Sequence, residues 1–245
     1  KCFDKIREIK EGGATILFVT HDVGSIRQLC DKAIWLDSGE VRMIGDVLGV
    51  TSKYMEFMFQ DEGTGADARP TNSLIDNTTS EAALEDIIPL EIDGIDTTKP
   101  INHWGESKGC VQLCHLYGEN GQRKQVFNDN ELIELRLRVK LPRNVSYDSL
   151  GVGFALRTIN GTDLVVYDTY GQGIEFNRDS DSCEILFSLA NPLNEGKYLL
   201  VIAVEDRSQA QPKYYEFIEG VEYFTVLRAE KHFGLFVPKV ACNIR

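Results

Sequence analysis

The first residues that could do chemistry lie at the end of an apolar run near the start of the sequence. Ile16–Val19 are four consecutive apolar residues, and Thr20, His21 and Asp22 come directly after them. Such a run predicts a β-strand buried on both faces, and α/β sheets place ligand chemistry at the carboxyl ends of these strands. Strands also end in polar residues that have no role. His21 is therefore a candidate functional residue whose weight depends on the elements after it in the chain.

The elements that would position His21 come next. The sequence predicts an amphipathic helix, a second apolar strand at 33–36 that ends in Asp37, and a turn at Ser38-Gly39 into Val41. This series resembles the end of an ATP-binding-cassette (ABC) ATPase, with its switch-histidine strand, a helix and a W-L-D-x-G-x-V strand. In that family the histidine at the position of His21 contacts the γ-phosphate of ATP across a dimer interface. An imidazole suits this task because it can donate a hydrogen bond to a phosphate oxygen and help to position water.

Other motifs that such an ATPase needs are absent from the sequence. There is no glycine-rich phosphate loop with its Lys, no acidic pair after a four-residue apolar run, and no L-S-G-G-Q signature loop. The chain also begins at Lys1 without a Met. We therefore expect residues 1–60 to be the C-terminal fragment of an ABC nucleotide-binding domain that does not hydrolyse ATP by itself. ATP and Mg²⁺ would be cofactors of the parent protein, and none is expected for this fragment.

The composition indicates a soluble protein without a nucleic-acid partner. The 245 residues are 42% hydrophobic, and no apolar run approaches the ~18 residues that would span a bilayer. The net charge is −12, and residues 61–100 contribute ten acidic and two basic residues to it. The remainder is close to neutral, so no basic face is available for phosphates. Six scattered cysteines indicate reduced thiols, which suits the cytoplasm. Four dispersed histidines predict no metal site, and no catalytic triad is visible.

The N-terminal part has the pattern of an incomplete α/β unit. We expect a helix over residues 1–12, a hairpin strand at 40–44 after the strand at 33–36, and a helix from 46 to 59. The parallel strand predicted at residues 16–19 needs cover on both faces, and residues 1–60 provide few neighbours for it. This unit is therefore expected to be poorly stable alone.

Residues 61–100 are rich in Gly, Ala, Asp, Thr, Asn and Ser. Such a segment buries too little apolar surface to offset the entropy of ordering, which predicts a linker. Its exception is Leu84–Ile95, whose apolar residues could form a short edge strand or dock on the domain that comes after it.

From residue 101 the apolar residues recur with a period of two. Leu135, Leu137 and Val139 alternate with polar residues, and Val152, Phe154 and Leu156 are predicted to alternate with an outer set that includes Arg157. We therefore expect strands at 111–115, 135–139, 152–156, 164–169, 184–189, 197–205, 214–218, 222–228 and 233–237, with turns at Asn160-Gly161, 194–196 and 218–220 among them. This pattern predicts a mainly β fold: an antiparallel β-sandwich of immunoglobulin-like or jelly-roll type over residues 101–245.

An ABC ATPase end joined by an acidic linker to a β-sandwich resembles the ATP-binding subunit of bacterial O-antigen polysaccharide exporters of the Wzt type. Within the sandwich the resemblance rests on the hairpin at 116–121, on Gly151–Ala155 with 160–162, and on 193–198. It implies that the C-terminal domain recognises the non-reducing, capped end of the glycan for ATP-driven export. It also implies a transmembrane partner subunit and a cytoplasmic location, peripheral on the inner membrane.

Sugar binding requires aromatic faces for the ring and planar hydrogen-bonding groups for the hydroxyls, and an acidic cap would favour Arg. We therefore take as candidates the arginines on the expected outer face and the tyrosines of later strands: Arg136, Arg138, Arg157, Tyr167, Tyr170 and Tyr214, with Tyr215 beside the last. His103-Trp104 and His115 are weaker candidates. For each residue the alternative is a solvated face or an ordinary sandwich aromatic.

Two further functional interpretations stay open. Residues 1–60 could complete an ATPase with another chain, in which case His21 matters only in the parent protein. Alternatively the sandwich could be structural, acting as a dimerisation domain or a docking site for a glycan-modifying enzyme without binding glycan itself. A homodimer is plausible in every case, since ABC ATPases work as dimers and sandwiches leave edge strands open.

Overall fold

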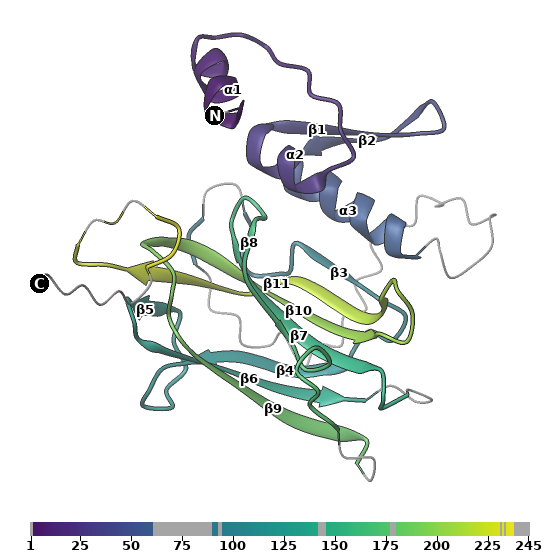
Figure 1. Cartoon of the computed structure of the whole chain (residues 1–245), viewed down its shortest axis with the longest axis vertical. Helices are drawn as coiled ribbons and strands as arrows, with labels where there is room; N and C mark the ends of the chain where they lie inside the picture. The colour runs from purple at the N-terminus through teal and green to yellow at the C-terminus, as the bar shows by residue number, and fades with distance from the viewer. Residues whose placement is uncertain are drawn as a thin grey trace, which may run out of the picture. The chain divides into compact units, whose positions relative to one another are not determined.

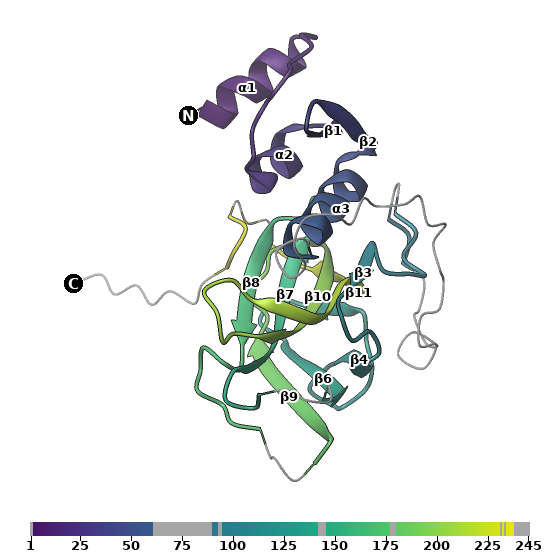
Figure 2. The same cartoon turned by 90° about the vertical axis from the view of Figure 1, so that its right-hand side faces the viewer.

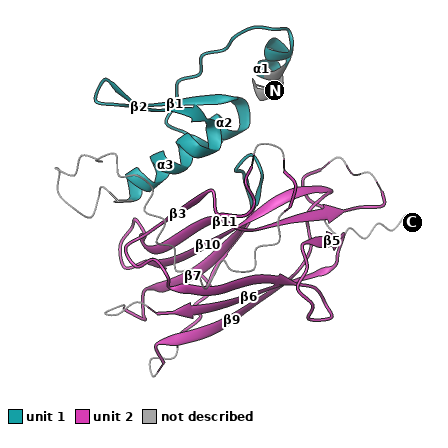
Figure 3. Cartoon of the chain, turned by 180° about the vertical axis from the view of Figure 1, so that it is seen from behind, with its two compact units in different colours: residues 1–73, 157–164 teal, residues 74–156, 165–245 magenta. Residues whose placement is uncertain are grey.

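The structure is a computed structural model, and it describes residues 2–60, 90–92, 95–141, 146–176, 180–230, 232 and 234–237. The chain divides into two compact units, which Figure 3 shows in different colours. The first unit comprises residues 1–73 and 157–164, and the second comprises residues 74–156 and 165–245.

The described part of the first unit consists mainly of helices and one β-hairpin. Its elements are α1 (Cys2–Glu11), α2 (Val23–Leu29), β1 (Lys32–Asp37), β2 (Glu40–Asp46) and α3 (Val47–Gln60). Asp22 caps α2, because its side chain accepts hydrogen bonds from two backbone N–H groups at 3.0 and 3.2 Å. Trp35 of β1 packs against α3, with its ring centroid 5.8 Å from that of Tyr54 and 5.1 Å from that of Phe57. The predicted first helix, hairpin and final helix of this unit are confirmed.

The predicted buried strand at Ile16–Val19 is wrong. Residues 14–20 form no strand, and the side chains of Leu17 and Val19 are 86% and 85% exposed. A strand of this kind needs a neighbour on each side and a layer over each face. The described residues provide neither for this run, so its apolar character alone does not make it a strand.

The second unit is dominated by two β-sheets that pack face to face. Its strands are β3 (Asn102–Trp104), β4 (Val111–Tyr117), β5 (Val126–Asn128), β6 (Leu132–Lys140), β7 (Leu150–Thr158), β8 (Asp163–Asp168), β9 (Ser182–Ala190), β10 (Gly196–Asp206) and β11 (Lys213–Leu227), with the β7–β8 turn assigned to the first unit. One sheet has the order β3-β11-β10-β7-β8, with β5 pairing in parallel to β11, and the other has the order β4-β6-β9 (Figures 1 and 2). The predicted antiparallel β-sandwich is therefore confirmed.

The core of the sandwich lies between the sheets, as the residues of β6 show. Ile133, Leu135, Leu137 and Val139 are almost fully buried, whereas the residues between them point outward. The alternation predicted for β7 is wrong, because both sets of its side chains are buried. Arg157 is consequently only 8% exposed and does not lie on a solvated face.

β11 is one long strand, although the sequence predicts two strands with a turn at 218–220. Its register on β10 shifts between Leu200, which faces Glu222, and Val201, which faces Glu219. The residues in between form a β-bulge in which Gly220 has a φ of +81°. On its other side β11 pairs with β3 before the bulge and with β5 after it. The bulge thus lets one strand serve two different neighbours.

Several predictions fall wholly or partly outside the described residues. Most of the predicted linker at 61–100 lies there, including residues 84–89 of the possible edge strand. Of the described remainder, Ile92 and Ile95 form an isolated bridge, and Thr97 bonds the backbone N–H and carbonyl of Leu90. Of the predicted strand at 233–237, residue 233 lies outside the described residues, and residues 234–237 form an isolated bridge between Phe236 and Leu193 instead of a strand.

Candidate functional site

A cleft of about 330 Å³ lies at the end of the sandwich where β7 begins and β8 ends. Its lining combines aromatic, acidic and aliphatic side chains: Tyr147, Tyr170, Phe176, Asp148, Glu175, Leu150 and Ile174. Tyr170 is 43% exposed. Aromatic faces next to hydrogen-bond acceptors in an open cleft suit a polar ligand that has apolar faces.

The loop after β8 is held in place by hydrogen bonds. Asp168 accepts one from the backbone N–H of Gly171 (2.6 Å), and Thr169 Oγ1 accepts one from the N–H of Val152 on β7 (3.0 Å). The N–H of Ile174 then donates back to the carbonyl of Thr169 (3.0 Å). The cleft residues of this loop are therefore positioned by hydrogen bonds within the loop and to β7.

A glycine in β7 allows β10 to approach the cleft. A Cβ atom at Gly151 would lie 3.3 Å from Glu205 Cγ and 3.4 Å from Tyr170 Cβ, which is a tight fit on both sides. Glu205 is buried and accepts a hydrogen bond from Arg207 Nε at 2.7 Å. Burial raises the pKa of the Glu205 carboxyl above its ordinary value, and the adjacent Arg207 partly offsets this.

Two of the predicted arginines lie on the outer face of the three-stranded sheet. Arg136 pairs with Glu134 (2.8 Å), and its guanidinium carbon stands 4.1 Å from the ring centroid of Tyr117. Arg138 makes two hydrogen bonds to Glu184 on β9, at 3.1 and 2.8 Å. Both arginines are therefore already neutralised by a carboxylate.

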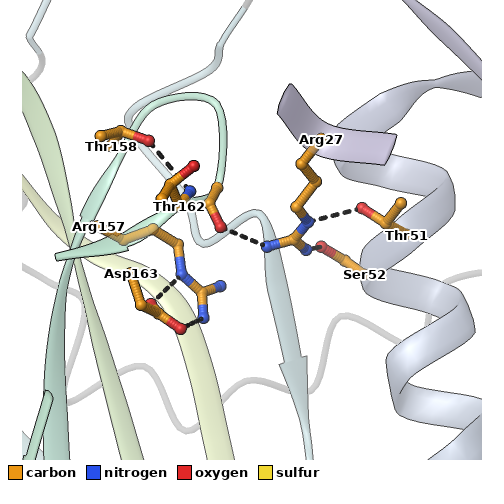
Figure 4. Close-up of polar contacts among 8 residues, drawn as sticks. Arg27, Thr51, Ser52, Arg157, Thr158, Thr162 and Asp163 are labelled. Atoms are coloured by element: carbon orange, nitrogen blue, oxygen red, sulfur yellow. Dashed lines mark hydrogen bonds and ion pairs between the residues drawn. The ribbon is translucent and has the colours of Figure 1, made fainter. Parts of the chain in front are cut away.

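The third predicted arginine lies apart from these two. Arg157 makes a two-pronged ion pair with Asp163 across the β7–β8 turn, at 2.6 and 3.0 Å (Figure 4). Figure 4 also shows Arg27, a buried arginine of the same unit that the sequence did not single out. It donates to the hydroxyls of Thr51 (2.8 Å) and Ser52 (3.0 Å), and to the Gly161 carbonyl at 3.4 Å. This guanidinium therefore joins α2 to the first half of α3.

The predicted tyrosines are also dispersed. The ring of Tyr167 packs against Phe187 and Phe154, with centroid distances of 5.5 and 6.1 Å, in the aromatic cluster between the sheets. The ring of Tyr214 packs against Trp104 at 5.0 Å. Of the six predicted binding residues, only Tyr170 lines the cleft. Tyr147, Phe176, Asp148 and Glu175 had no signal in the sequence, because they lie in loops without periodicity.

The weaker candidates His103 and His115 contact two buried glutamates of β11. His103 Nε2 lies 2.7 Å from Glu216 Oε1, and His115 Nδ1 lies 3.0 Å from Glu222 Oε1. The same carboxylates accept hydrogen bonds from backbone N–H groups of the β4 segment, at residues 109, 111 and 116. These contacts satisfy the outer edge of β4 and link the two sheets, which is a structural role.

His21 is exposed and lies directly before Asp22, the N-cap of α2. Its neighbour Asp22 has a lowered pKa, chiefly because the Ser25 hydroxyl donates a hydrogen bond to it. The proposed contact of His21 with ATP stays a prediction about the parent protein.

The described residues were also compared with the requirements of a metal site, and their cysteines with those of a reactive thiol. No three His, Cys, Asp or Glu side chains gather there in a way that could hold a metal ion. Cys30, Cys110, Cys114 and Cys183 are thiols, and burial raises the pKa of Cys110 to about 12. Within the described residues, every helix is too short or too polar to cross a bilayer.

Two sheets packed face to face, with an open cleft at one end, define this unit as an antiparallel β-sandwich domain. The model of the Wzt C-terminal domain family matches residues 101–237, which is more than half of the chain, and the chain belongs to this family. The crystal structure of the C-terminal domain of Wzt superposes with a TM-score of 0.50 over 59% of this chain and 88% of that one. The sequence identity of 17% means that this likeness concerns the fold alone.

A separate similarity links 58 residues of the chain to ATP-binding proteins. Over these residues it is 48% identical to the teichoic acids export ATP-binding protein TagH of Listeria monocytogenes serotype 4b (strain F2365), and 41% identical to TagH of Bacillus anthracis. The match covers 24% of this chain in both cases, and 17% and 11% of the relatives. The chain therefore spans under a fifth of the length of these proteins.

Proposed function

We propose that this chain is part of the ATP-binding subunit of an ABC exporter and that its sandwich binds the polysaccharide to be exported. The observation that carries the proposal is the Wzt C-terminal family match, which covers residues 101–237 and includes the cleft at the end of β7 and β8. The 58-residue similarity to TagH supports the link to an export ATPase.

The cleft offers the groups that a sugar requires. The rings of Tyr147, Tyr170 and Phe176 can pack against the C–H faces of a pyranose. The carboxylates of Asp148 and Glu175 can accept hydrogen bonds from its hydroxyls. Recognition of this kind requires no covalent bond of the ligand to form or break, so the proposed role is binding without turnover.

The finer parts of the proposal concern the parent protein. In it the glycan is an O-antigen read at its non-reducing end, and export is driven by ATP with Mg²⁺. His21 contacts the γ-phosphate across a homodimer, and a transmembrane subunit completes the exporter at the cytoplasmic side of the inner membrane. The similarity of part of the chain to TagH supports the ATP-binding role.

Calorimetric titration of the whole chain with polysaccharide from the source organism tests the proposal. We expect saturable binding that disappears when the non-reducing end is removed, and a large loss of affinity in Tyr170→Ala. Trp104 is only 2% exposed and packed against Tyr214, so its fluorescence is a poor reporter. Absence of binding to the intact polysaccharide would contradict the proposal.

A second candidate, a dimerisation domain, is favoured by the open sides of the sheets. β8 and β9 each end a sheet in the described strand order, and they expose Val166 (67%) and Leu186 (57%). Edge strands of this kind can pair with a second copy. This role predicts a dimer in sedimentation experiments that dissociates in Val166→Lys or Leu186→Lys, with no glycan binding.

A further inference from the structure

We propose that the cleft at the end of β7 and β8 takes an uncharged pyranose unit and discriminates against the same sugar carrying a carboxylate or phosphate. This inference rests on the proposed function and names the class of sugar that the site accepts. It reverses the expectation that an arginine recognises an acidic cap.

The three candidate arginines all lie in existing ion pairs. Each is already paired with a carboxylate: Arg136 with Glu134, Arg138 with Glu184, and Arg157 with Asp163. An anionic sugar would have to compete with an existing carboxylate partner in every case, which reduces the gain from a new ion pair. None of the three lines the cleft.

The charged side chains at the cleft are acidic. Its lining contains two acidic side chains, Asp148 and Glu175, which belong to exposed residues, and no basic side chain lines it among the described residues. The guanidinium of Arg207, just after β10, is engaged by other carboxylates: it bonds Glu205 (2.7 Å) and lies 3.9 Å from Asp168. The described surroundings therefore carry negative charge.

The hydrogen-bonding chemistry points in the same direction. An ionised carboxylate only accepts hydrogen bonds, so it is satisfied by hydroxyl groups, which donate. Replacing the C6 hydroxymethyl group of a hexose by a carboxylate removes a donor and adds a like charge. Two unit charges about 4 Å apart in water repel by about 1 kcal/mol, which corresponds to roughly a fivefold weaker affinity.

The test uses the full chain and matched pairs of small sugars. Methyl glucoside, galactoside and mannoside are compared with the corresponding methyl uronides at low salt, by observing the backbone amide resonances of Gly171 and Gly173 in NMR spectra. We expect at least one neutral sugar to shift these resonances, and its uronide to bind roughly fivefold more weakly or worse. In Glu175→Gln the ratio of the two dissociation constants should move toward one.

Glu119→Gln is the matched control, because it removes an exposed carboxylate of the turn after β4, which does not line the cleft. It should leave the ratio unchanged. Equal or tighter binding of the uronides, or neutral sugars that shift only resonances of β6 and β9, would overturn the inference. If the polysaccharide binds in calorimetry but no neutral sugar perturbs the cleft, the inference fails and the proposed function stands. If the polysaccharide does not bind either, both fail.

Discussion

At the level of single residues, two glutamates of β11 stabilise the contact between the two sheets. Glu216 and Glu222 are almost completely buried in β11, yet each carboxylate is surrounded by donors. Glu216 bonds the N–H groups of Gly109 (2.8 Å) and Val111 (2.6 Å), and Glu222 bonds the N–H of Leu116 (2.9 Å). Burying a carboxylate is costly unless its lone pairs are satisfied, so these contacts explain why charged residues are tolerated in the core.

Glu216→Gln should destabilise the sandwich by about 2–4 kcal/mol, since an amide places donors against backbone donors in a buried site. Urea denaturation measures the change. Glu184→Gln, at an exposed ion pair, is the control and should change stability by at most about 0.5 kcal/mol. Similar small effects in both variants would show that the buried carboxylate is not needed.

The raised pKa of Tyr223 predicts that the free energy of unfolding decreases at high pH. Its phenol is fully buried and donates to the Lys99 carbonyl at 3.3 Å. Burial raises its pKa well above the ordinary value, and nearby Glu219 adds to the shift. The folded state therefore holds this proton more tightly than the unfolded state, whose tyrosines titrate near pH 10.

The stability from this phenol is complete below about pH 10 and is lost as pH rises further, with a slope of at most about 1.4 kcal/mol per pH unit. Tyr223→Phe should lower stability at pH 8 but make its decline between pH 9 and 11 shallower. The free energy of unfolding measured at several pH values provides the check. Parallel declines in both proteins would contradict the assignment.

At the level of elements, the bulge in β11 decides how the larger sheet is assembled. Gly220 has a positive φ, and a Cβ atom there would lie 2.5 Å from the Tyr223 hydroxyl oxygen. Only glycine fits such a position without strain or a clash. The bulge also separates the part of β11 that pairs with β3 from the part that pairs with β5.

Gly220→Ala should therefore cost about 2–4 kcal/mol, from backbone strain and from displacement of Tyr223. Gly173→Ala is the matched control. It also has a positive φ, but no atom lies within 4 Å of the added methyl group, so it should cost about 1 kcal/mol. Thermal unfolding of the two variants measures the difference, and equal costs would exclude the steric contribution.

The strands were predictable from the sequence where one face of the strand is buried and the other is exposed to solvent. β6 has the predicted period-two pattern, and the sandwich could be inferred from such strands. β7 could not be divided into inner and outer faces, because both sets of side chains are buried. The turn predicted at residues 218–220 failed because glycine signals a bulge as readily as a turn.

The cleft was predictable only through Tyr170. Its other aromatic and acidic residues lie in loops, where no periodicity shows which side chains converge. The arginines were identifiable as residues but not as partners of carboxylates, since the pairs Arg138–Glu184 and Arg157–Asp163 depend on strand pairing and on the β7–β8 turn. Glu216 and Glu222 gave no signal because acidic residues are normally exposed.

At the level of the whole molecule, the two units differ in how well their apolar residues are covered. The sandwich buries its core between the sheets. The first unit leaves Leu17, Val19 and Leu36 largely exposed, so less of its surface is removed from water.

We therefore expect the chain to unfold in two calorimetric steps, with residues 2–60 of the first unit melting first. Hydrogen exchange measured by mass spectrometry should show early exchange in residues 14–20 and late exchange in β10. A chain that begins at residue 90 serves as the control and should retain the upper transition. A single transition in the intact chain would mean that the units are energetically coupled.

The glutamates of β11 also have a mechanical consequence. Glu216 and Glu222 hold β4 at two points, near Val111 and at Leu116, so a slide of one sheet along the other would have to break both anchors together. Apolar contacts between the sheets are non-directional, whereas hydrogen bonds weaken steeply when their distance and angle change, so these contacts fix the position of β4 against β11. The domain is proposed to bind a polysaccharide during its export. Contacts that keep the two sheets from sliding would let the binding site hold its shape when force acts on the bound polymer.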